Sequence, residues 1–295
     1  MPYFHIPVML REVLEYLQPR RAQKFVDCTL GGAGYTLALA DKIGPTGKII
    51  GIDLDDLAIK NATVEIKRQK LSNIVLVQDN FKNLKKIVRE NFSASAKLDG
   101  IVFDLGLSSA QLDDEARGFS FKGERPLDMA FGPSGVGSTE QIVNEFPLLE
   151  LTRIFRDYGE EKRAYYIAKA IVAARQEKRI RTTSDLVAII EKAVPFRYHV
   201  RIHPATRIFQ ALRMATNEEL QVLLEVLPQA VELLKPTGRI VVVSFHSGED
   251  RIVKRFFKST ENLHILTKRP LIPTEAETAD NPRARSAKLR AATKV

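Results

Sequence analysis

The stretch from Lys24 to Asp53 constrains the fold most, because a strand, a glycine turn, a helix and a second strand follow one another in it. The apolar run Phe25–Val26 ends at Asp27, and the turn TLGGAG leads into a helix near Tyr35. Glycines let the backbone approach a ligand closely, and the free amides of a helix start attract an anionic group. The second run, KIIGID, ends at Asp53, whose carboxylate can accept both hydroxyls of a ribose. A nucleoside-bearing ligand is the first hypothesis.

The spacing of the glycines indicates which nucleoside ligand the turn suits. Gly32 and Gly34 are followed by Leu37, where a dinucleotide fingerprint has its third glycine. A pyrophosphate is therefore poorly provided for. S-adenosylmethionine fits better, because its small amino-acid end can sit at the turn while its ribose reaches Asp53. Taken alone, the stretch is equally well explained as a tight turn between a strand and a helix.

The alternation of strands and helices continues and predicts a parallel, doubly wound sheet. Ligands of such a sheet lie at the carboxyl ends of its strands. Two late strands are expected to form an antiparallel edge. The expected later elements are helices at 56–70, 82–91 and 218–234, strands at 74–78, 98–104 and 239–245, and the two late strands at 264–267 and 286–293.

The segment between Asp104 and Asn217 is too long for a simple connection, so it must hold structure of its own. We interpret it as an inserted helical subdomain with helices at 148–158, 161–178, 183–194 and 204–216. Residues 109–137 are rich in glycine and charge and are expected to form a loop or lid. The expected division is 1–108 and 217–295 for the main domain and 109–216 for the insertion.

Composition narrows the class of protein. The chain has 295 residues, a formal net charge of +9 and one cysteine, Cys28, which excludes a disulfide framework and a thiolate zinc cluster. His199 and His203 lack a supporting glutamate or cysteine, so we expect no metal centre. The N-terminus shows no targeting segment and no run suits a membrane span. We expect a cytoplasmic protein with no membrane contact and, from its charge, a polyanionic partner.

A set of motifs spread over nearly the whole chain carries a resemblance to one family. They are HIPVM, DCTLGGAGY, GIDLD, DNF, DLGLSSAQLD, RGFSF, PLDM, YGEE, FQALR, NEEL, SFHSGEDR and NPRARSAKLR. In this order they resemble the bacterial 16S ribosomal RNA (cytosine-N4)-methyltransferase family. The resemblance implies a class I (Rossmann-like) methyltransferase fold with a helical insertion. It also implies methyl transfer from S-adenosyl-L-methionine to the exocyclic amino nitrogen of a cytidine in small-subunit ribosomal RNA. The implied partner is the small ribosomal subunit, and a homodimer is kept as a further hypothesis.

The resemblance also implies cofactor contacts, each at a position that matches a family motif. They fall on Ala33, Gly34, Tyr35, Asp53, Phe81, Asp104 and Gln111. Phe81 is expected near the adenine, with a core phenylalanine as the alternative. The chain departs from the family, which usually has glycine at Ala33, histidine at Tyr35, proline at Ala110, arginine at Ala130 and leucine at Gly248.

The chemistry of the implied substrate indicates which groups would act on it. The cytosine amine is a poor nucleophile until its lone pair leaves conjugation with the ring, so acceptors must take its hydrogens. We assign this role to Asp104, Ser108 and His246, or to the backbone carbonyls of 105–108, with positioning supplying much of the acceleration. His246 is equally well explained as a residue that orders its loop.

Basic residues in the insertion and tail are expected to contact RNA, with Tyr198 and His199 available for stacking. The basic residues are Arg175, Lys178, Arg179, Arg181, Arg197, Arg201, Arg207, Arg283, Arg285, Lys288 and Arg290. Two alternatives stay open. One is a methyltransferase for DNA or a small molecule, although the usual motif of DNA amino-methyltransferases is missing after the fourth strand. The other is a non-catalytic RNA-binding protein that keeps the cofactor site as structure.

Overall fold

A computed structural model describes residues 7–107, 118–121, 123–132, 138–194 and 203–295. By its internal contacts the chain divides into two compact units. One consists of Met1–Ser108 with Leu220–Val295, and the other of Ser109–Glu219. We call them the sheet unit and the helical unit and describe each by itself. The domain boundaries expected at 108/109 and 216/217 stay a prediction.

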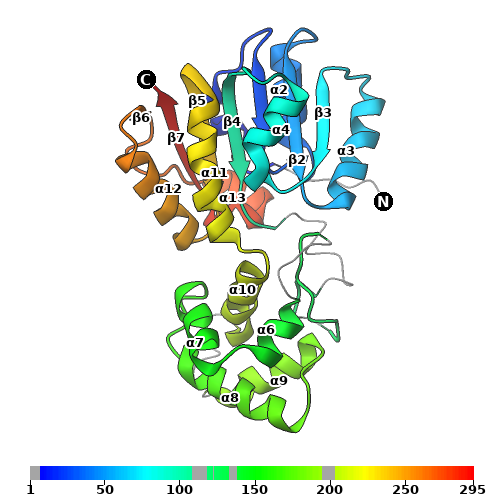
Figure 1. Ribbon diagram of the computed structural model, residues 1–295, viewed down its shortest axis with the longest axis vertical. Coiled ribbons are helices and arrows are strands. Elements are labelled where there is room, and N and C mark those ends of the chain that lie inside the picture. The colour runs from blue at the N-terminus through cyan, green and yellow to red at the C-terminus, as the bar shows by residue number, and fades with distance from the viewer. Residues whose placement is uncertain (1–6, 108–117, 122, 133–137, 195–202) are drawn as a thin grey trace. The chain divides into compact units, whose positions relative to one another are not determined.

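The sheet unit is built on a seven-stranded sheet in the order β3-β2-β1-β4-β5-β7-β6 (Figure 1). The first five strands run parallel, and β7 pairs antiparallel with both β5 and β6. This confirms the doubly wound sheet and its antiparallel edge. The strands are β1 Lys24–Asp27, β2 Lys48–Asp53, β3 Ile74–Gln78, β4 Leu98–Asp104, β5 Leu234–Ser244, β6 Leu263–Ile265 and β7 Lys288–Lys294.

Helices cover both faces of this sheet because successive strand residues point to opposite sides. Phe25 and Ile49 belong to the core that α1 (Leu10–Leu17) and α2 (Gly34–Ile43) close. Their neighbours Val26 and Ile50 belong to the core on the other face. That face is closed by α4 (Leu84–Asn91), α11 (Glu219–Leu233) and α12 (Ser247–Ser259). The remaining elements of the unit are α3 Asp56–Arg68, η1 Phe81–Asn83, α13 Glu275–Asp280 and η4 Pro282–Ser286.

The strand β5 begins five residues earlier than the sequence predicts. We expected a turn at 235–238 and a strand from Arg239, but pairing with β4 already starts at Leu234. The register shifts between Leu98 and Gly100, and Thr237 takes a left-handed conformation with φ 66°. The expected turn residues therefore form a bulge inside the strand, which the turn pattern alone does not distinguish from a turn before it.

The helical unit contains α6 Thr139–Glu145, α7 Leu148–Asp157, α8 Ala164–Glu177, α9 Thr183–Ala193 and α10 Pro204–Thr216 (Figure 1). Four of these match the expected helices, while the short α6 was not expected. The start of α9 is fixed by a capping box, in which the Thr182 hydroxyl accepts from the Asp185 amide and the Asp185 carboxylate accepts in return. Pro204 occupies the first turn of α10, as the sequence predicts.

Residues 109–137 were expected to form a loop or lid outside the core, but several of the described residues among them are buried. Phe119, Leu127 and Met129 are buried. Pro126 forms a β-bridge with Thr182, and the Arg125 amide donates to the Thr183 hydroxyl. The expectation that this segment stays out of the core is therefore wrong for these residues. Hydrogen bonds to the start of α9 hold the segment in place although its composition is typical of loops.

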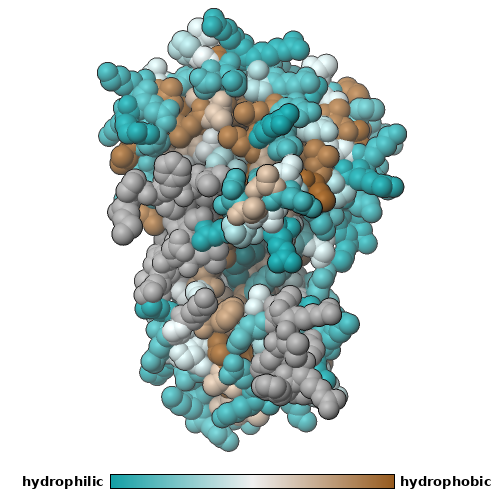
Figure 2. Space-filling view, turned by 180° about the vertical axis from the view of Figure 1, so that it is seen from behind, coloured by the Kyte–Doolittle hydropathy of each residue, from teal (hydrophilic) through white to brown (hydrophobic). Residues whose placement is uncertain are grey.

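None of the helices in the described ranges combines the length and the apolar character that crossing a membrane requires. Seen from behind, the described surface is mostly hydrophilic, with smaller hydrophobic areas (Figure 2).

A matched pair of glycine substitutions tests the backbone of the turn before α2. Ala33 is buried with φ 62°, and a left-handed alanine costs roughly 1–2 kcal/mol, which glycine avoids. Ala40 is equally buried but lies inside α2. We expect Ala40→Gly to lower the free energy of unfolding by at least about 1 kcal/mol more than Ala33→Gly, as measured by urea denaturation. Equal losses would mean that Ala33 carries no strain.

Candidate functional site

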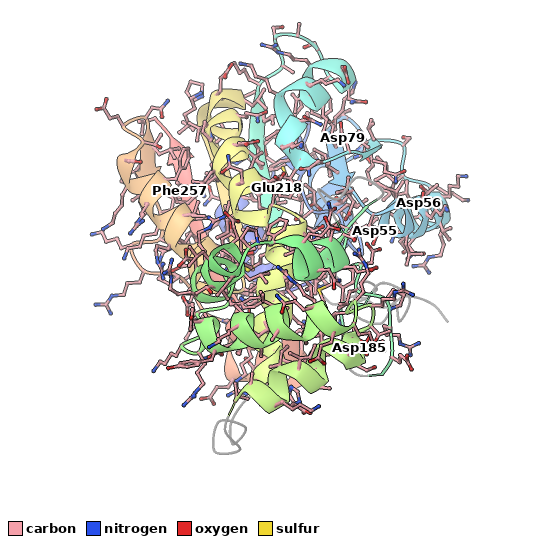
Figure 3. All side chains as sticks on the ribbon, turned by 60° about the horizontal axis from the view of Figure 1, so that its bottom comes forward. Asp55, Asp56, Asp79, Asp185, Glu218 and Phe257 are labelled. Atoms are coloured by element: carbon pink, nitrogen blue, oxygen red, sulfur yellow. The ribbon has the colours of Figure 1, made fainter. Side chains whose placement is uncertain are left out.

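Three carboxylates lie at the same edge of the sheet. Asp27, Asp53 and Asp104 are the last residues of β1, β2 and β4, which are neighbours in the sheet and run parallel. Asp79 follows β3 and its amide donates to the Asp53 carbonyl; Figure 3 labels Asp79 and, after β2, Asp55. The strand ends, where ligands of such a sheet are expected to lie, thus carry acidic side chains.

A hydrogen-bond network holds the ends of β1 and β4 together. The Asp27 carboxylate is fully buried and accepts from the Thr36 hydroxyl at 2.8 Å and from the Thr29 amide at 3.2 Å. The Thr29 hydroxyl accepts from the Asp104 amide at 2.6 Å. Burial raises the pKa of Asp27 to about 6, although these hydrogen bonds act to lower it. One buried acid therefore links β1, α2 and β4.

Asp53 is held in place and keeps capacity to accept further hydrogens. One carboxylate oxygen accepts from the Gly31 amide at 2.8 Å and the other from the Asp55 amide at 2.9 Å. Each oxygen of a carboxylate has a second lone pair. Burial raises the pKa of Asp53 to about 6, and the same two amides act against that rise. The geometry thus leaves this residue able to accept from a pair of hydroxyls.

Asp104 carries a buried oxygen, Oδ1, that has no hydrogen-bond partner among the described residues. Burial raises the pKa of Asp104 well above its usual range, and the charges of Asp27 and Glu249 raise it further. A buried acceptor left open in this way calls for a ligand or a further residue to satisfy it. Ser108 and Gln111, expected beside it, lie outside the described residues.

The turn before α2 fixes where its backbone amides lie. Ala33 is the N-cap residue of α2 and has a left-handed backbone conformation. A Cβ atom at Gly34 would lie only 2.8 Å from ring carbons of Pro7, so a side chain there would collide with Pro7. The Tyr35 ring is buried, and its hydroxyl donates to the Val8 carbonyl. The Tyr35 side chain is therefore engaged in packing, and any contact it makes at the turn is left to its backbone amide.

Phe81 takes the core role that was the alternative for it, and its contact with an adenine stays a prediction. It starts η1 directly after β3, and its ring meets the ring of Phe103 edge to face, with 5.8 Å between centroids. It packs against the core while remaining half-buried. The core role is therefore present, and part of the side chain stays accessible.

His246 orders its loop, as the alternative explanation of this residue expects. Its Nδ1 accepts from the Gly248 amide at 3.1 Å and the Glu249 amide at 3.3 Å, so it caps α12. Because Nδ1 accepts, the proton of the neutral ring sits on Nε2, 3.0 Å from a Glu249 oxygen. This tautomer supports the loop-ordering role, and a role of His246 as an acceptor of amine hydrogens stays a prediction.

Glu249 is a site residue that we did not single out from the sequence. Its side chain is almost fully buried and accepts from the backbone amides of Phe245 and His246. A signal was present, since a glutamate three residues after a capping residue is typical of a capping box. Asp27, Thr29 and Thr36 were missed as well, although the sequence places Asp27 and Thr29 at the end of the first strand.

Several basic residues expected to contact RNA make hydrogen bonds or ion pairs with other residues of the protein. Arg290 makes a two-pronged ion pair with Asp250, at 2.6 and 3.2 Å, and Arg179 pairs with Glu140 at 2.7 Å. Arg175 donates to the Val143 carbonyl, and Arg207 lies 3.7 Å from the buried Glu161. Each of these four thus has a partner within the protein, and their contact with RNA stays a prediction. Arg197, Tyr198, His199 and Arg201 lie outside the described residues.

Within the described ranges, no group of three or more histidine, cysteine, aspartate or glutamate side chains is arranged to hold a metal ion. His203 instead caps α10, with Nδ1 accepting from the Ala205 amide and Nε2 lying 3.1 Å from Glu191.

The raised pKa of Asp27 predicts a pH-dependent effect of Asp27→Asn on stability. The pKa of Asp27 is higher in the folded state, about 6, than its ordinary value of 3.8. Its carboxyl group therefore stabilises the folded state fully below pH 3.8, and this contribution is lost as the pH rises through about 6. Asparagine removes the buried charge and can still pair with Thr29 and Thr36. We compare the free energy of unfolding of the variant with that of wild type by urea denaturation at two pH values. The difference should favour the variant by roughly 1–3 kcal/mol more at pH 7.5 than at pH 4.5. The same difference at both pH values would contradict a charged, buried Asp27.

Comparison with known proteins identifies the family. The model of the MraW methylase family matches residues 2–295. Two relatives named "Ribosomal RNA small subunit methyltransferase H" come from Heliobacterium mobile and Halothermothrix orenii. The first is 43% identical over 100% of both chains, and the second is 44% identical over 99% of this chain and 98% of the relative. A Streptococcus mutans protein solved in complex with SAH shares the fold, with a TM-score of 0.50, 12% identity and coverage of 99% and 100%. This chain belongs to the MraW methylase family.

Proposed function

We propose that the chain transfers a methyl group from S-adenosylmethionine to the exocyclic amino nitrogen of a cytidine in 16S ribosomal RNA. The observation that carries the proposal is the Asp104 carboxylate, whose buried Oδ1 is open among the described residues, in a full-length member of a methylase family. The relatives' name specifies small-subunit ribosomal RNA as what they modify. The amine that receives the methyl group carries N–H hydrogens, and a carboxylate oxygen without a hydrogen-bond partner can accept one of them.

The residues at the strand ends fit the cofactor in charge and shape. Asp53 has lone pairs open for two ribose hydroxyls, and Phe81, which follows the neighbouring strand β3, keeps its ring half-buried. Gly34, which has no room for a side chain, starts a helix with its amides toward the turn. We assign Ala33, Gly34, Tyr35, Asp53, Phe81, Asp104 and Gln111 to cofactor binding on this basis and on the family resemblance. When bound, S-adenosylmethionine supplies an electrophilic methyl group.

The proposed role of Asp104 is to accept an amine hydrogen as the methyl group is transferred. A bond forms between the amine nitrogen and the methyl carbon while the bond from that carbon to sulfur breaks, and the nitrogen then gives up a proton. The raised pKa of Asp104, caused chiefly by burial, makes its carboxylate a stronger base for that proton. Glu249 and Thr29 position the loop and the backbone around it. Ser108 stays a proposed second acceptor, whereas His246 is assigned to loop order.

The partner and location belong to the same proposal. The relatives' name supports ribosomal RNA as the substrate, and we extend this to the assembled small subunit as the form recognised. A cytoplasmic location and a homodimer stay predictions.

Transfer of a labelled methyl group tests the function. The purified chain should label small subunits that lack the modification and should leave duplex DNA unlabelled. Equal labelling of DNA would contradict the substrate, and absence of turnover on any RNA would indicate a non-catalytic RNA-binding protein.

Asp53→Ala tests the ribose contact. Loss of hydrogen bonds to a carboxylate costs about 1.5–3 kcal/mol, so the affinity for S-adenosylmethionine should fall roughly ten- to a hundredfold in calorimetry. Asp56→Ala is the matched control, because it removes a negative charge nearby from an exposed side chain (Figure 3). Unchanged affinity in the Asp53 variant, with its fold verified by thermal unfolding, would refute the assignment.

Asp104→Ala tests the chemical step separately from binding. At saturating cofactor, single-turnover methylation of small subunits should be abolished, because no carboxylate then accepts the amine hydrogen. Asp99→Ala is the control: Asp99 also lies in β4 but pairs with Lys235. Near-normal single-turnover rates in the Asp104 variant would leave this residue a structural or binding role.

A further inference from the structure

Two adjacent tyrosines on α8 expose their rings although the helix has a buried side. Ala164, Ile167, Ala168 and Ile171 face the core of the helical unit. Tyr165 and Tyr166 lie on the other side and are 47% and 62% exposed. They are the only aromatic residues among the exposed large hydrophobic side chains of the described ranges. Single exposed apolar residues are ordinary, but two neighbouring aromatic rings form a surface that a partner can use.

The two rings offer separate faces. Their centroids lie 5.9 Å apart and their planes are inclined by 78°, so they meet edge to face. In such a pair the edge of one ring covers one face of the other, and the remaining π-faces are open to flat groups. They suit bases that are splayed apart in a single strand or loop better than bases stacked within a duplex.

Lysines flank the tyrosines on both sides along the chain. Lys162 lies in the turn before α8, and Lys169 lies one turn after Tyr165 on the same face. Both lysines are exposed, and within the described part of the chain neither makes an ion pair. By contrast, Arg153 and Arg156 on the preceding helix α7 pair with acidic neighbours. Cations next to stacking rings are the combination that binds single-stranded nucleic acid.

We propose that this face of α8, made of Lys162, Tyr165, Tyr166 and Lys169, binds unpaired bases of the ribosomal RNA substrate. The tyrosine rings stack on bases and the lysines contact phosphates. The inference rests on the proposed function and adds a substrate-binding surface to it. It adds these lysines to the expected RNA surface, in which Arg175, Arg179, Arg207 and Arg290 are already bonded to other residues of the protein. A protein partner is disfavoured, because apart from the tyrosines only Leu149 among the described residues of the helical unit is a large exposed hydrophobic residue.

Ring-specific substitutions test the stacking. The double variant Tyr165→Leu/Tyr166→Leu keeps apolar area but removes both rings, whereas Tyr165→Phe/Tyr166→Phe keeps them. With small subunits that lack the modification, we expect the leucine variant to raise KM for the subunit by roughly tenfold or more, with kcat and cofactor affinity unchanged. The phenylalanine variant should stay within about twofold of wild type. Leu149→Ala on α7 is the control for loss of exposed apolar surface.

Charge substitutions test the phosphate contacts. Lys162→Gln/Lys169→Gln should weaken binding and make it less dependent on salt, because each lost phosphate contact lowers the salt slope by about 0.7 for single strands. Lys67→Gln/Lys70→Gln, which changes exposed lysines at the end of α3 in the sheet unit, should leave the salt slope as in wild type.

A photoreactive benzoylphenylalanine in place of Tyr166, in the full chain, identifies the partner directly. We expect it to cross-link to 16S ribosomal RNA within the small subunit. Cross-links to a ribosomal protein, or none, would overturn the proposal, as would a leucine variant that behaves like wild type. These failures are distinguishable from failure of the proposed function, because in that case the wild-type chain itself would not methylate small subunits.

Discussion

The buried carboxylate of Asp27 is the interaction on which the rest of the site depends. Through Thr36 it fixes the start of α2, and through Thr29 it reaches the backbone of Asp104. A shift of its pKa from 3.8 to about 6 corresponds to roughly 3 kcal/mol of cost for its charged form at neutral pH, an upper bound because neighbouring acids titrate with it. A cost of this order is typical of a site built for function rather than stability. The glycine turn and the acid of β4 are thereby held in one arrangement.

The accumulation of negative charge at one edge of the sheet follows from the fold. Parallel strands bring their carboxyl ends together. Burial is the largest cause of the raised pKa values of Asp27, Asp53 and Asp104, and a neighbouring acid raises each of these pKa values further. Such an edge favours a positively charged ligand, and the sulfonium and ammonium groups of S-adenosylmethionine supply positive charge. Acids whose charge costs stability at neutral pH would then attract the cofactor.

The sequence predicts much of this arrangement because the hydrophobic pattern follows the strands closely. Asp53 and Asp104 were expected at strand ends and lie there. What could not be predicted depends on contacts between distant segments. The role of His246 depends on which ring nitrogen accepts from the helix start, and the engagement of Arg290 depends on Asp250, forty residues earlier. The bulge at Thr237 depends on pairing with β4, which a local turn pattern does not contain.

The central claim is that the acid at the end of β4 serves an exocyclic amine, and the position of the methyl group in the product tests it most directly. Small subunits treated with the purified chain and S-adenosylmethionine would be digested, and the modified nucleoside would be mapped by mass spectrometry in their 16S ribosomal RNA. The account predicts one cytidine carrying the methyl group on its exocyclic nitrogen. A methyl group on a ring carbon, on a ribose hydroxyl or on a ribosomal protein would contradict it.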